Sequence, residues 1–349
     1  MAETGGSGPK RLPSGDVGAH MCTRVLWNDS GRAVYVGRNM DWFEDMHTNL
    51  WSLPRGMDRE GMTEVNPLRW TSRFGSLIAT AYDAGTADGI NEAGLAAHML
   101  YLPETSVGER DPAVPGLSMS MWPQWYLDQC ATVAEAVERT RQAPFQLRMA
   151  VYPANGKAAT VHLALDDASG DSAIIECIGG EVRIFHDRRY LVMTNQPRFE
   201  QQLANLRRYR GFGGDERLPG TNEPADRFVR SAYYVTHLPT PDSEREAVAA
   251  LMSVMRNVAA PFGISDPERP NVSTTIWRTI ENLSDMVLYY DGVLSPHLFW
   301  VEGRRLDFAE GAATLRLLVD GNFSLTNDVT DRFEPTPMFR FLPAIEGWD

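Results

Sequence analysis

The sequence contains few cysteines, no long apolar run and fewer basic than acidic residues. Three of its 349 residues are cysteine, an odd number without Cys-x-x-Cys spacing, which excludes a disulfide framework and argues against a zinc site built on cysteines. Its 33 basic and 46 acidic residues give a net charge of −13, so the chain lacks the positive surface of a nucleic-acid-binding protein. An anionic membrane would repel it, and no apolar run approaches the ~20 residues that span a bilayer. We therefore expect neither a nucleic-acid partner nor a membrane partner.

Several common catalytic and cofactor motifs are also absent. The chain has no GxGxxG that opens a helix after a strand, no GxxxxGK[ST], no HExxH and no GxSxG. Its seven histidines are scattered, and no two of them are four residues apart. The sequence therefore predicts no cofactor and no metal site.

Residues 1–20 differ in composition from the rest of the chain. They are rich in glycine, proline and serine, and they contain too few apolar side chains to fold alone. They also lack the apolar region of a secretory signal. We expect residues 1–21 to be a disordered leader or a segment added by cloning. As written, the chain is expected in the cytoplasm; if residues 1–21 replace a native export signal, it is expected in the periplasm.

From residue 22 onward, strand patterns and helix patterns occur in blocks. We find no internal repeat and no linker, so we predict a single domain over residues 22–349. Blocks of strands, then helices, then strands are typical of antiparallel sheets packed against helices. The predicted fold class is therefore α+β. The predicted strands are 22–27, 33–42, 76–83, 94–102, 160–167, 172–178, 181–187, 190–195, 274–283, 285–292, 297–302 and 313–319. The predicted helices are 118–142, as one long helix or two short ones with Thr132 as a cap, 198–210, 225–238 and 243–258.

The three cysteines are not equivalent. Cys130 and Cys177 lie in apolar runs and are predicted to be buried in the core. Cys22 lies where ordered structure is expected to begin. A cysteine nucleophile needs a base, and a cysteine that becomes the first residue has one in its own α-amino group, whose pKa of about 7.7–8.0 allows proton exchange at neutral pH. From the residues alone, Cys22 could equally be a small hydrophobic residue in an edge strand.

A series of sequence blocks favours the nucleophile. The blocks are CTRVLW…GRNMDW, LWSLPRGM, DGINEAGL, MLYLPE, VMTNQPRFE and LPGTNEPADRFVRSAYY, in this order over roughly residues 22–300. Together they resemble the choloylglycine hydrolase and penicillin V acylase family of N-terminal-nucleophile amidases. The short stretch between Asn195 and Arg227 lacks the insertion of the Gram-positive members, so the chain looks closer to the Gram-negative branch. The resemblance implies a four-layer αββα sandwich.

The resemblance also implies roles around the thiol. Cys22 matches the nucleophile, which is exposed by removal of residues 1–21. Arg38 matches the arginine that stabilises the thiolate, an effect that a nearby guanidinium is known to have. Asp41 matches the carboxylate that hydrogen-bonds the new α-amine. Taken without the family, Arg38 and Asp41 could instead form a structural ion pair.

Further positions match residues that stabilise the oxyanion of the reaction or lie near it. Asn195 matches the side-chain amide of the oxyanion hole, and Tyr101 matches the residue whose backbone N–H completes it. Two such donors suit the tetrahedral intermediate of amide hydrolysis. Arg227 matches a second active-site arginine, and Arg230 in the same predicted helix is the residue most easily confused with it. Without the family, Asn195 could be an ordinary turn residue.

The implied reaction is hydrolysis of an amide between a bulky apolar acyl group and a polar amine. Known substrates of the family include conjugated bile salts, penicillin V and long-chain N-acyl homoserine lactones. Tyr101 resembles the tyrosine of penicillin V acylases, yet bile salt hydrolysis is the commonest family activity, and we expect it first. Trp42 and Phe43 are predicted either to line the acyl pocket or to be ordinary core.

Two expectations concern assembly and activity. Family members are often homotetramers, so we expect a homo-oligomer, either a tetramer or a dimer. If Met21 were never removed, the amine base would be missing. The chain would then be a catalytically silent binder of amphipathic ligands.

Overall fold

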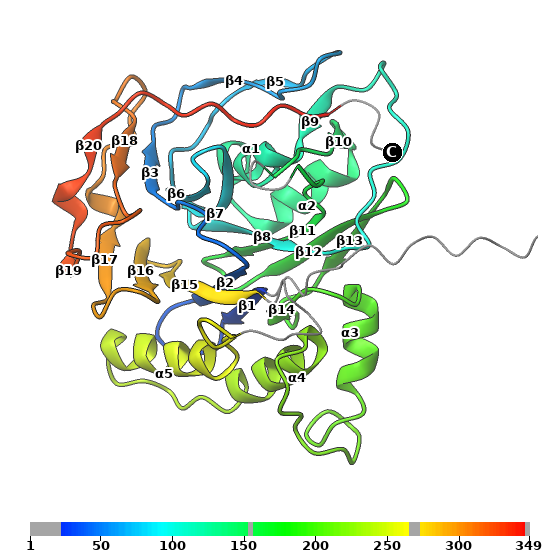
Figure 1. Cartoon of the computed structure of the whole chain (residues 1–349), viewed down its shortest axis with the longest axis vertical. Helices are drawn as coiled ribbons and strands as arrows, with labels where there is room; N and C mark the ends of the chain where they lie inside the picture. The colour runs from blue at the N-terminus through cyan, green and yellow to red at the C-terminus, as the bar shows by residue number, and fades with distance from the viewer. Residues whose placement is uncertain (1–21, 153–155, 265–272, 346–349) are drawn as a thin grey trace, which may run out of the picture.

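The computed structural model describes residues 22–152, 156–264 and 273–345, so the predicted leader over residues 1–21 lies outside the described residues. Two large β-sheets pack face to face, and helices cover the outer face of each (Figure 1). This arrangement is the expected four-layer αββα sandwich. Both sheets are antiparallel apart from one parallel pair, β17 with β19.

The first sheet has seven strands and begins with the hairpin expected from the sequence. Its order is β14 (Val192–Met193), β1 (Cys22–Trp27), β2 (Tyr35–Trp42), β15 (Thr274–Asn282), β16 (Val287–Gly292), β17 (Phe299–Glu302) and β19 (Asn327–Asp328). Strands β1 and β2 are buried along their whole length because both faces of this sheet are covered. The same burial on both faces encloses the polar side chains of Arg38, Asn39 and Asp41 on β2.

The second sheet has nine strands. Its order is β13 (Glu181–His186), β12 (Ser172–Ile178), β11 (Val161–Asp167), β8 (Leu95–Tyr101), β7 (Gly85–Asn91), β6 (Ser76–Ala81), β3 (Leu50–Leu53), β18 (Leu315–Leu317) and β20 (Glu334–Pro335). Two small pairs complete the strands: β4 (Asp58–Glu60) with β5 (Arg69–Thr71), and β9 (Gly116–Ser118) with β10 (Gln146–Arg148). No helix of the described residues is both long enough and apolar enough to cross a membrane.

Helices α1 (Trp122–Gln129) and α2 (Val133–Arg141) cover the nine-stranded sheet, whereas α3 (Phe199–Leu206), α4 (Pro224–Val235) and α5 (Glu244–Asn257) cover the seven-stranded sheet (Figure 1). The predicted helical stretch 118–142 is two helices. Thr132 caps the second of them by accepting a hydrogen bond from the backbone N–H of Glu135. Three short 3₁₀ helices span Met119–Met121, Gly303–Arg305 and Thr330–Arg332.

Three apolar clusters correspond to the three interfaces between the layers. The largest lies between the sheets and includes Cys22. A second lies between the nine-stranded sheet and α1 and α2, and it contains both Cys130 and Cys177, as predicted. A third joins α5 to β1 and β2. Helix α5 approaches β2 so closely that a Cβ on Gly37 would lie 2.7 Å from Cγ and Sδ of Met255, so a larger residue there would displace the Met255 side chain.

Candidate active site

Cys22 is the first residue of β1 and faces the space between the two sheets. It is 2% exposed, and it pairs with Met40 of β2. Its Sγ lies 3.7 Å from the carbonyl oxygen of Asp41 and 3.9 Å from Sδ of Met40. Because side chains alternate along a strand, Arg38 and Met40 share the face of Cys22, whereas Asp41 and Thr23 point to the helical side. The two faces of this hairpin therefore supply different groups to one site.

Arg38 is held beside Cys22 by the opposite sheet. Its Nε lies 2.8 Å from Oδ1 of Asp88 on β7, and its Nη2 donates to the carbonyl oxygen of Met99 on β8 at 2.9 Å. The side chain is fully buried. Burial opposes its charge, but the charges of Asp88 and Cys22 and their hydrogen bonds outweigh burial and raise the pKa of Arg38. A permanent cation thus stands next to the thiol.

Asp41 is fixed from the helical side of the seven-stranded sheet. Its Oδ1 accepts a hydrogen bond of 2.5 Å from the hydroxyl of Thr275 on β15, and its Oδ2 lies 3.7 Å from Nη1 of Arg227. Burial raises the pKa of Asp41, against the lowering effects of Arg227, Thr275 and Arg38. Among the described residues, Oδ2 has no hydrogen-bond partner. One oxygen of this carboxylate is therefore free to accept a further N–H.

Asn195 follows β14 and contacts Cys22 directly. Its Oδ1 accepts from the backbone nitrogen of Cys22 at 2.5 Å and from Nη2 of Arg227 at 2.9 Å, and its Nδ2 donates to the carbonyl oxygen of Tyr101 at 2.8 Å. These contacts fix the orientation of the amide. In this chain the nitrogen of Cys22 is a peptide nitrogen, and it donates to Asn195; the contact of a free α-amine with Asp41 stays a prediction.

Arg227 joins the groups on the helical side. From α4 its Nη1 donates to the carbonyl oxygen of Cys22 at 2.7 Å and to the hydroxyl of Thr23. Burial lowers the pKa of Arg227, although the charges of Asp41 and Cys22 act in the opposite direction. Arg230, one turn later, instead donates to the carbonyl oxygen of Thr221. The structure thus places Arg227 in contact with Cys22, whereas Arg230 contacts Thr221.

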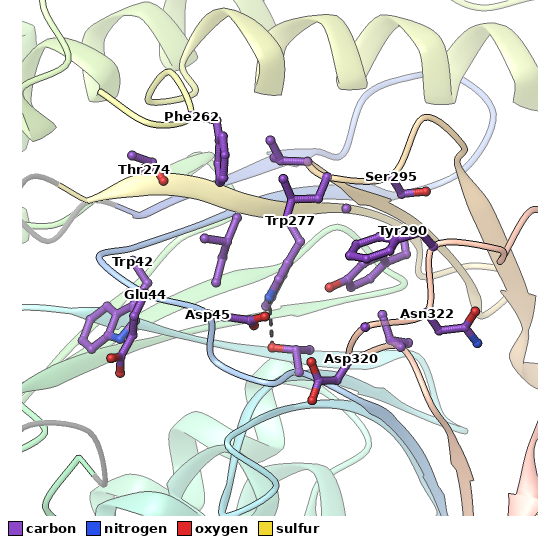
Figure 2. A pocket seen from close by; sticks show the side chains of 18 of the residues that line it. Trp42, Glu44, Asp45, Phe262, Thr274, Trp277, Tyr290, Ser295, Asp320 and Asn322 are labelled. Carbon is purple, nitrogen blue, oxygen red and sulfur yellow. Dashed lines mark hydrogen bonds between the residues drawn. The ribbon is translucent and has the colours of Figure 1, made fainter. Parts of the chain in front are cut away.

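A cavity of about 470 Å³ begins at Trp42, the residue after Asp41 (Figure 2), and Cys22 itself is not among the residues that line it. Trp42 and Phe43, directly after Asp41, line it together with Trp277 and Tyr290. Trp42 is 3% exposed and packs on Phe43, with ring centroids 5.2 Å apart. Trp42 thus belongs to the core and also lines a cavity; that this cavity receives the acyl group stays a prediction.

Some site residues could not be found from the sequence. Thr275, Asp88 and Tyr82 come from strands or turns far along the chain, and no motif marks them. Nε1 of Trp42 donates to the hydroxyl of Tyr82 at 2.9 Å, and that hydroxyl in turn donates to the carboxylate of Glu44. Only the packing of the sheets brings these residues to the thiol and to the pocket.

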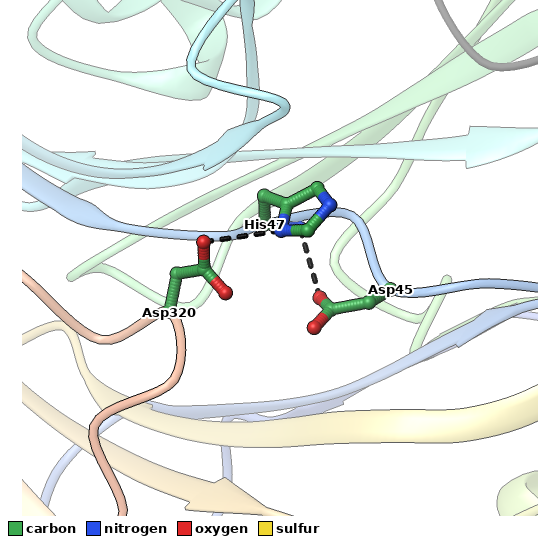
Figure 3. Close-up of side chains that lie close together, drawn as sticks. All are labelled: Asp45, His47 and Asp320. Carbon is green, nitrogen blue, oxygen red and sulfur yellow. Dashed lines mark hydrogen bonds and ion pairs between the residues drawn. The ribbon is translucent and has the colours of Figure 1, made fainter.

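One cluster of potential metal ligands lies among the described residues, at the edge of the pocket (Figure 3). It consists of Asp45, His47 and Asp320, whose ligand atoms lie within 4.8 Å of one another. Nδ1 of His47 lies 3.1 Å from Oδ2 of Asp320, and the His47 side chain is 62% exposed. Exposed acidic groups commonly gather without an ion, so this cluster gives no argument for a metal.

The chain is similar to known proteins along most of its length. The profile of the linear amide C–N hydrolases, choloylglycine hydrolase family, matches residues 22–310. A penicillin V acylase of Pectobacterium atrosepticum is 38% identical over 344 residues, 92% of each chain. A bile salt hydrolase/transferase of Clostridium perfringens is 25% identical over 295 residues, 77% of this chain and 84% of that protein.

Solved structures of similar proteins have the same fold. The structure of penicillin V acylase from Agrobacterium tumefaciens is 42% identical, covers 92% of this chain and 100% of its own, and superposes with a TM-score of 0.84. A conjugated bile acid hydrolase of Clostridium perfringens, at 20% identity, covers 88% of this chain and 98% of its own, and shares the fold with a TM-score of 0.73. The chain therefore belongs to the choloylglycine hydrolase family and is a hydrolase of linear amide carbon–nitrogen bonds.

Proposed function

We propose that this protein is an N-terminal cysteine amidohydrolase whose nucleophile is Cys22 and whose preferred substrate is penicillin V or an amide like it. The observation that carries the proposal is the set of contacts around Cys22. A buried cation, Arg38, lies beside its thiol, and Asn195 and Arg227 contact its main chain. A guanidinium in this position can stabilise the negative charge that the sulfur carries when it attacks.

The proposed reaction has two steps. The α-amine of Cys22 takes the thiol proton, and the thiolate attacks the amide carbon to form a C–S bond. The protonated amine then gives its proton to the leaving nitrogen as the C–N bond breaks. In the second step water attacks the thioester, its proton passes to the α-amine, and the carboxylic acid leaves as the thiol re-forms. Asp41, whose Oδ2 has no hydrogen-bond partner among the described residues, would orient the amine.

The oxyanion needs donors in both steps. An amide nitrogen carries two hydrogens, and Nδ2 of Asn195 uses one of them on Tyr101. We propose that its second hydrogen, together with the backbone N–H of Tyr101, binds the oxyanion. A single donor of this kind contributes ~10²–10³ to kcat.

The substrate proposal departs from the first expectation of bile salts. The two penicillin V acylases are 38% and 42% identical to this chain, whereas the bile salt hydrolases are about 25% identical. The phenoxyacetyl group of penicillin V is aromatic, and the cavity that begins at Trp42 is lined by aromatic side chains such as Trp42, Phe43 and Trp277. Conjugated bile salts and long-chain N-acyl homoserine lactones are the competing substrates of the same reaction.

The test compares kcat/KM for penicillin V, glycine- and taurine-conjugated bile salts and a long-chain N-acyl homoserine lactone, with intact-mass analysis of the same sample. We expect a mature chain of 349 − 21 = 328 residues that begins at Cys22, with the highest kcat/KM for penicillin V. The Cys22→Ala variant should be inactive. A higher kcat/KM for bile salts would overturn the substrate proposal. Full activity of a chain that keeps Met21 would overturn the mechanism, whereas an inactive chain that keeps Met21 would favour the silent binder.

A further inference from the structure

On the side of Arg38 that faces away from Cys22 lies a group of buried titratable residues: Asp88, His98 and Glu281. Oδ1 of Asp88 accepts from Nε of Arg38 at 2.8 Å and lies 2.9 Å from Nδ1 of His98 on β8. Since a carboxylate can only accept, Nδ1 of His98 carries a proton. Nε2 of His98 lies 3.7 Å from Oε2 of Glu281 on β15. Arg38, Asp88, His98 and Glu281 are each at most 1% exposed.

These four residues link the two sheets. Arg38 and Glu281 belong to the seven-stranded sheet, where Thr279 of β15 stands opposite Arg38, so Glu281 shares the inward face two residues away. Asp88 and His98 stand opposite each other in the nine-stranded sheet. Neither carboxylate oxygen of Glu281 has a hydrogen-bond partner within the described part of the chain. Burying a carboxylate without hydrogen bonds costs folding free energy. A function at Glu281 would compensate for this cost.

We propose that His98 and Glu281 are positioning residues for Arg38: through Asp88 they keep the guanidinium charge available to Cys22 and so favour its thiolate. The inference rests on the proposed function of Cys22 and Arg38. A charged His98 shares Oδ1 of Asp88 with Arg38, so Asp88 neutralises Arg38 only in part. Glu281 stabilises the charged form of His98 from the other side.

Within the described ranges, two further charged residues, Asp166 and Arg24, lie close to this group. Asp166 of β11 acts on both His98 and Glu281, and its own partner is Arg24 of β1, at 3.2 Å. Burial opposes the charge on His98, but Glu281 and Asp88 outweigh it and raise the pKa of His98. Burial raises the pKa of Glu281 to about 7. The group can therefore change its charge within the pH range where the enzyme would work.

Two conservative variants test the proposal. In His98→Asn the amide can still donate to Asp88 from the place of Nδ1, but it carries no charge. In Glu281→Gln the imidazolium loses a carboxylate partner, an effect expected above about pH 7, where Glu281 is charged; this loss lowers the pKa of His98. In both cases Asp88 neutralises Arg38 more fully. We expect the pH midpoint for alkylation of Cys22 by iodoacetamide to rise by about one pH unit, since neighbouring charges shift a pKa by 1–3 units.

The change in the thiol should also appear in the steady-state kinetics of the two variants. For penicillin V, kcat of His98→Asn should fall about tenfold on the acidic side of the profile and recover at high pH, with KM unchanged. Because Glu281 is charged only above about pH 7, kcat of Glu281→Gln should differ from that of the wild type only above that pH. The matched control is a second buried pair, His162 and Glu176, whose Nδ1 and Oε1 lie 3.4 Å apart at 1% exposure. His162→Asn and Glu176→Gln should leave the alkylation midpoint unchanged.

The outcomes separate this inference from the proposed function. If His98→Asn and Glu281→Gln lose stability but keep the wild-type alkylation midpoint, the pair is merely structural and the inference fails, even when Cys22→Ala is inactive. If Cys22→Ala still hydrolyses amides, the proposed function fails, while the alkylation midpoint still reports on Arg38.

Discussion

The backbone nitrogen of Cys22 donates a hydrogen bond of 2.5 Å to Oδ1 of Asn195, 173 positions along the chain. The register explains the contact. Strands β1 and β14 are antiparallel and pair Arg24 with Met193. Cys22 lies two residues before Arg24 and Asn195 two residues after Met193, so this register directs the two residues toward each other. A single strand pairing thus brings the predicted nucleophile to the predicted oxyanion donor.

Removal of the Asn195 side chain should slow hydrolysis without removing the thiol. We expect Asn195→Ala to lower kcat by ~10²–10³, because one oxyanion donor is lost. Steady-state kinetics with penicillin V measures the effect, and alkylation of Cys22 should still proceed. The control is Asn282→Ala, at a buried asparagine that bonds Glu244 and Asp285 instead; it should retain kcat. Equal losses in the two variants would contradict the assignment.

Loss of Arg227 should destabilise the fold. Arg227→Met leaves the buried carboxylate of Asp41 without its ion-pair partner, and such a loss costs about 3–5 kcal/mol. Urea unfolding would give the difference in the free energy of unfolding. Arg230→Met is the matched comparison because Arg230 donates to carbonyl groups and to Asn257. A larger loss in Arg230→Met than in Arg227→Met would count against this account.

The three thiols should differ in reactivity. Burial raises the pKa of Cys130 to about 12 and that of Cys177 to about 11, so both remain protonated near neutral pH. Alkylation of the native protein at pH 8, followed by peptide mass analysis, should label Cys22, whereas the unfolded protein should be labelled at all three. Labelling of Cys130 or Cys177 before Cys22 would refute the prediction.

Glu281 should make stability depend on pH. Its folded-state pKa of about 7 lies above its ordinary value of 4.5, so its contribution to stability is fully present below pH 4.5 and is lost as the pH rises to about 7. Glu281→Gln lacks this loss. Its free energy of unfolding relative to the wild type should therefore increase by about 3 kcal/mol over that range, at about 1.4 kcal/mol per pH unit. A constant difference between the two proteins across the range would exclude the effect.

Trp42 should control acyl binding. Trp42→Ala removes an aromatic wall of the pocket and is expected to raise KM for penicillin V at least about tenfold, since burial of a large apolar side chain contributes ~1.5–3 kcal/mol. Trp300→Ala is the control, because Trp300 lies on β17, is partly buried and is not among the residues that line this pocket. The hypothesis fails if KM stays at the wild-type value in Trp42→Ala.

The sequence by itself determined the family and the α+β class, and it named the candidate residues around Cys22. The blocks CTRVLW…GRNMDW and VMTNQP are local, and strand alternation alone separates Arg38 from Asp41 on β2. The helix ends before Cys130 and a second one begins after Thr132; the sequence offered this cap but left one long helix open as the alternative.

Only the tertiary structure decided what surrounds the thiol. Thr275 reaches Asp41, and Asp88 reaches Arg38, because strands distant in sequence pair or face each other across the sandwich. The same packing places His98 between two carboxylates and turns Trp42 toward the cavity. A motif records neighbours along the chain, whereas charge balance in a buried site depends on groups that only the packing of two sheets brings within a few ångströms.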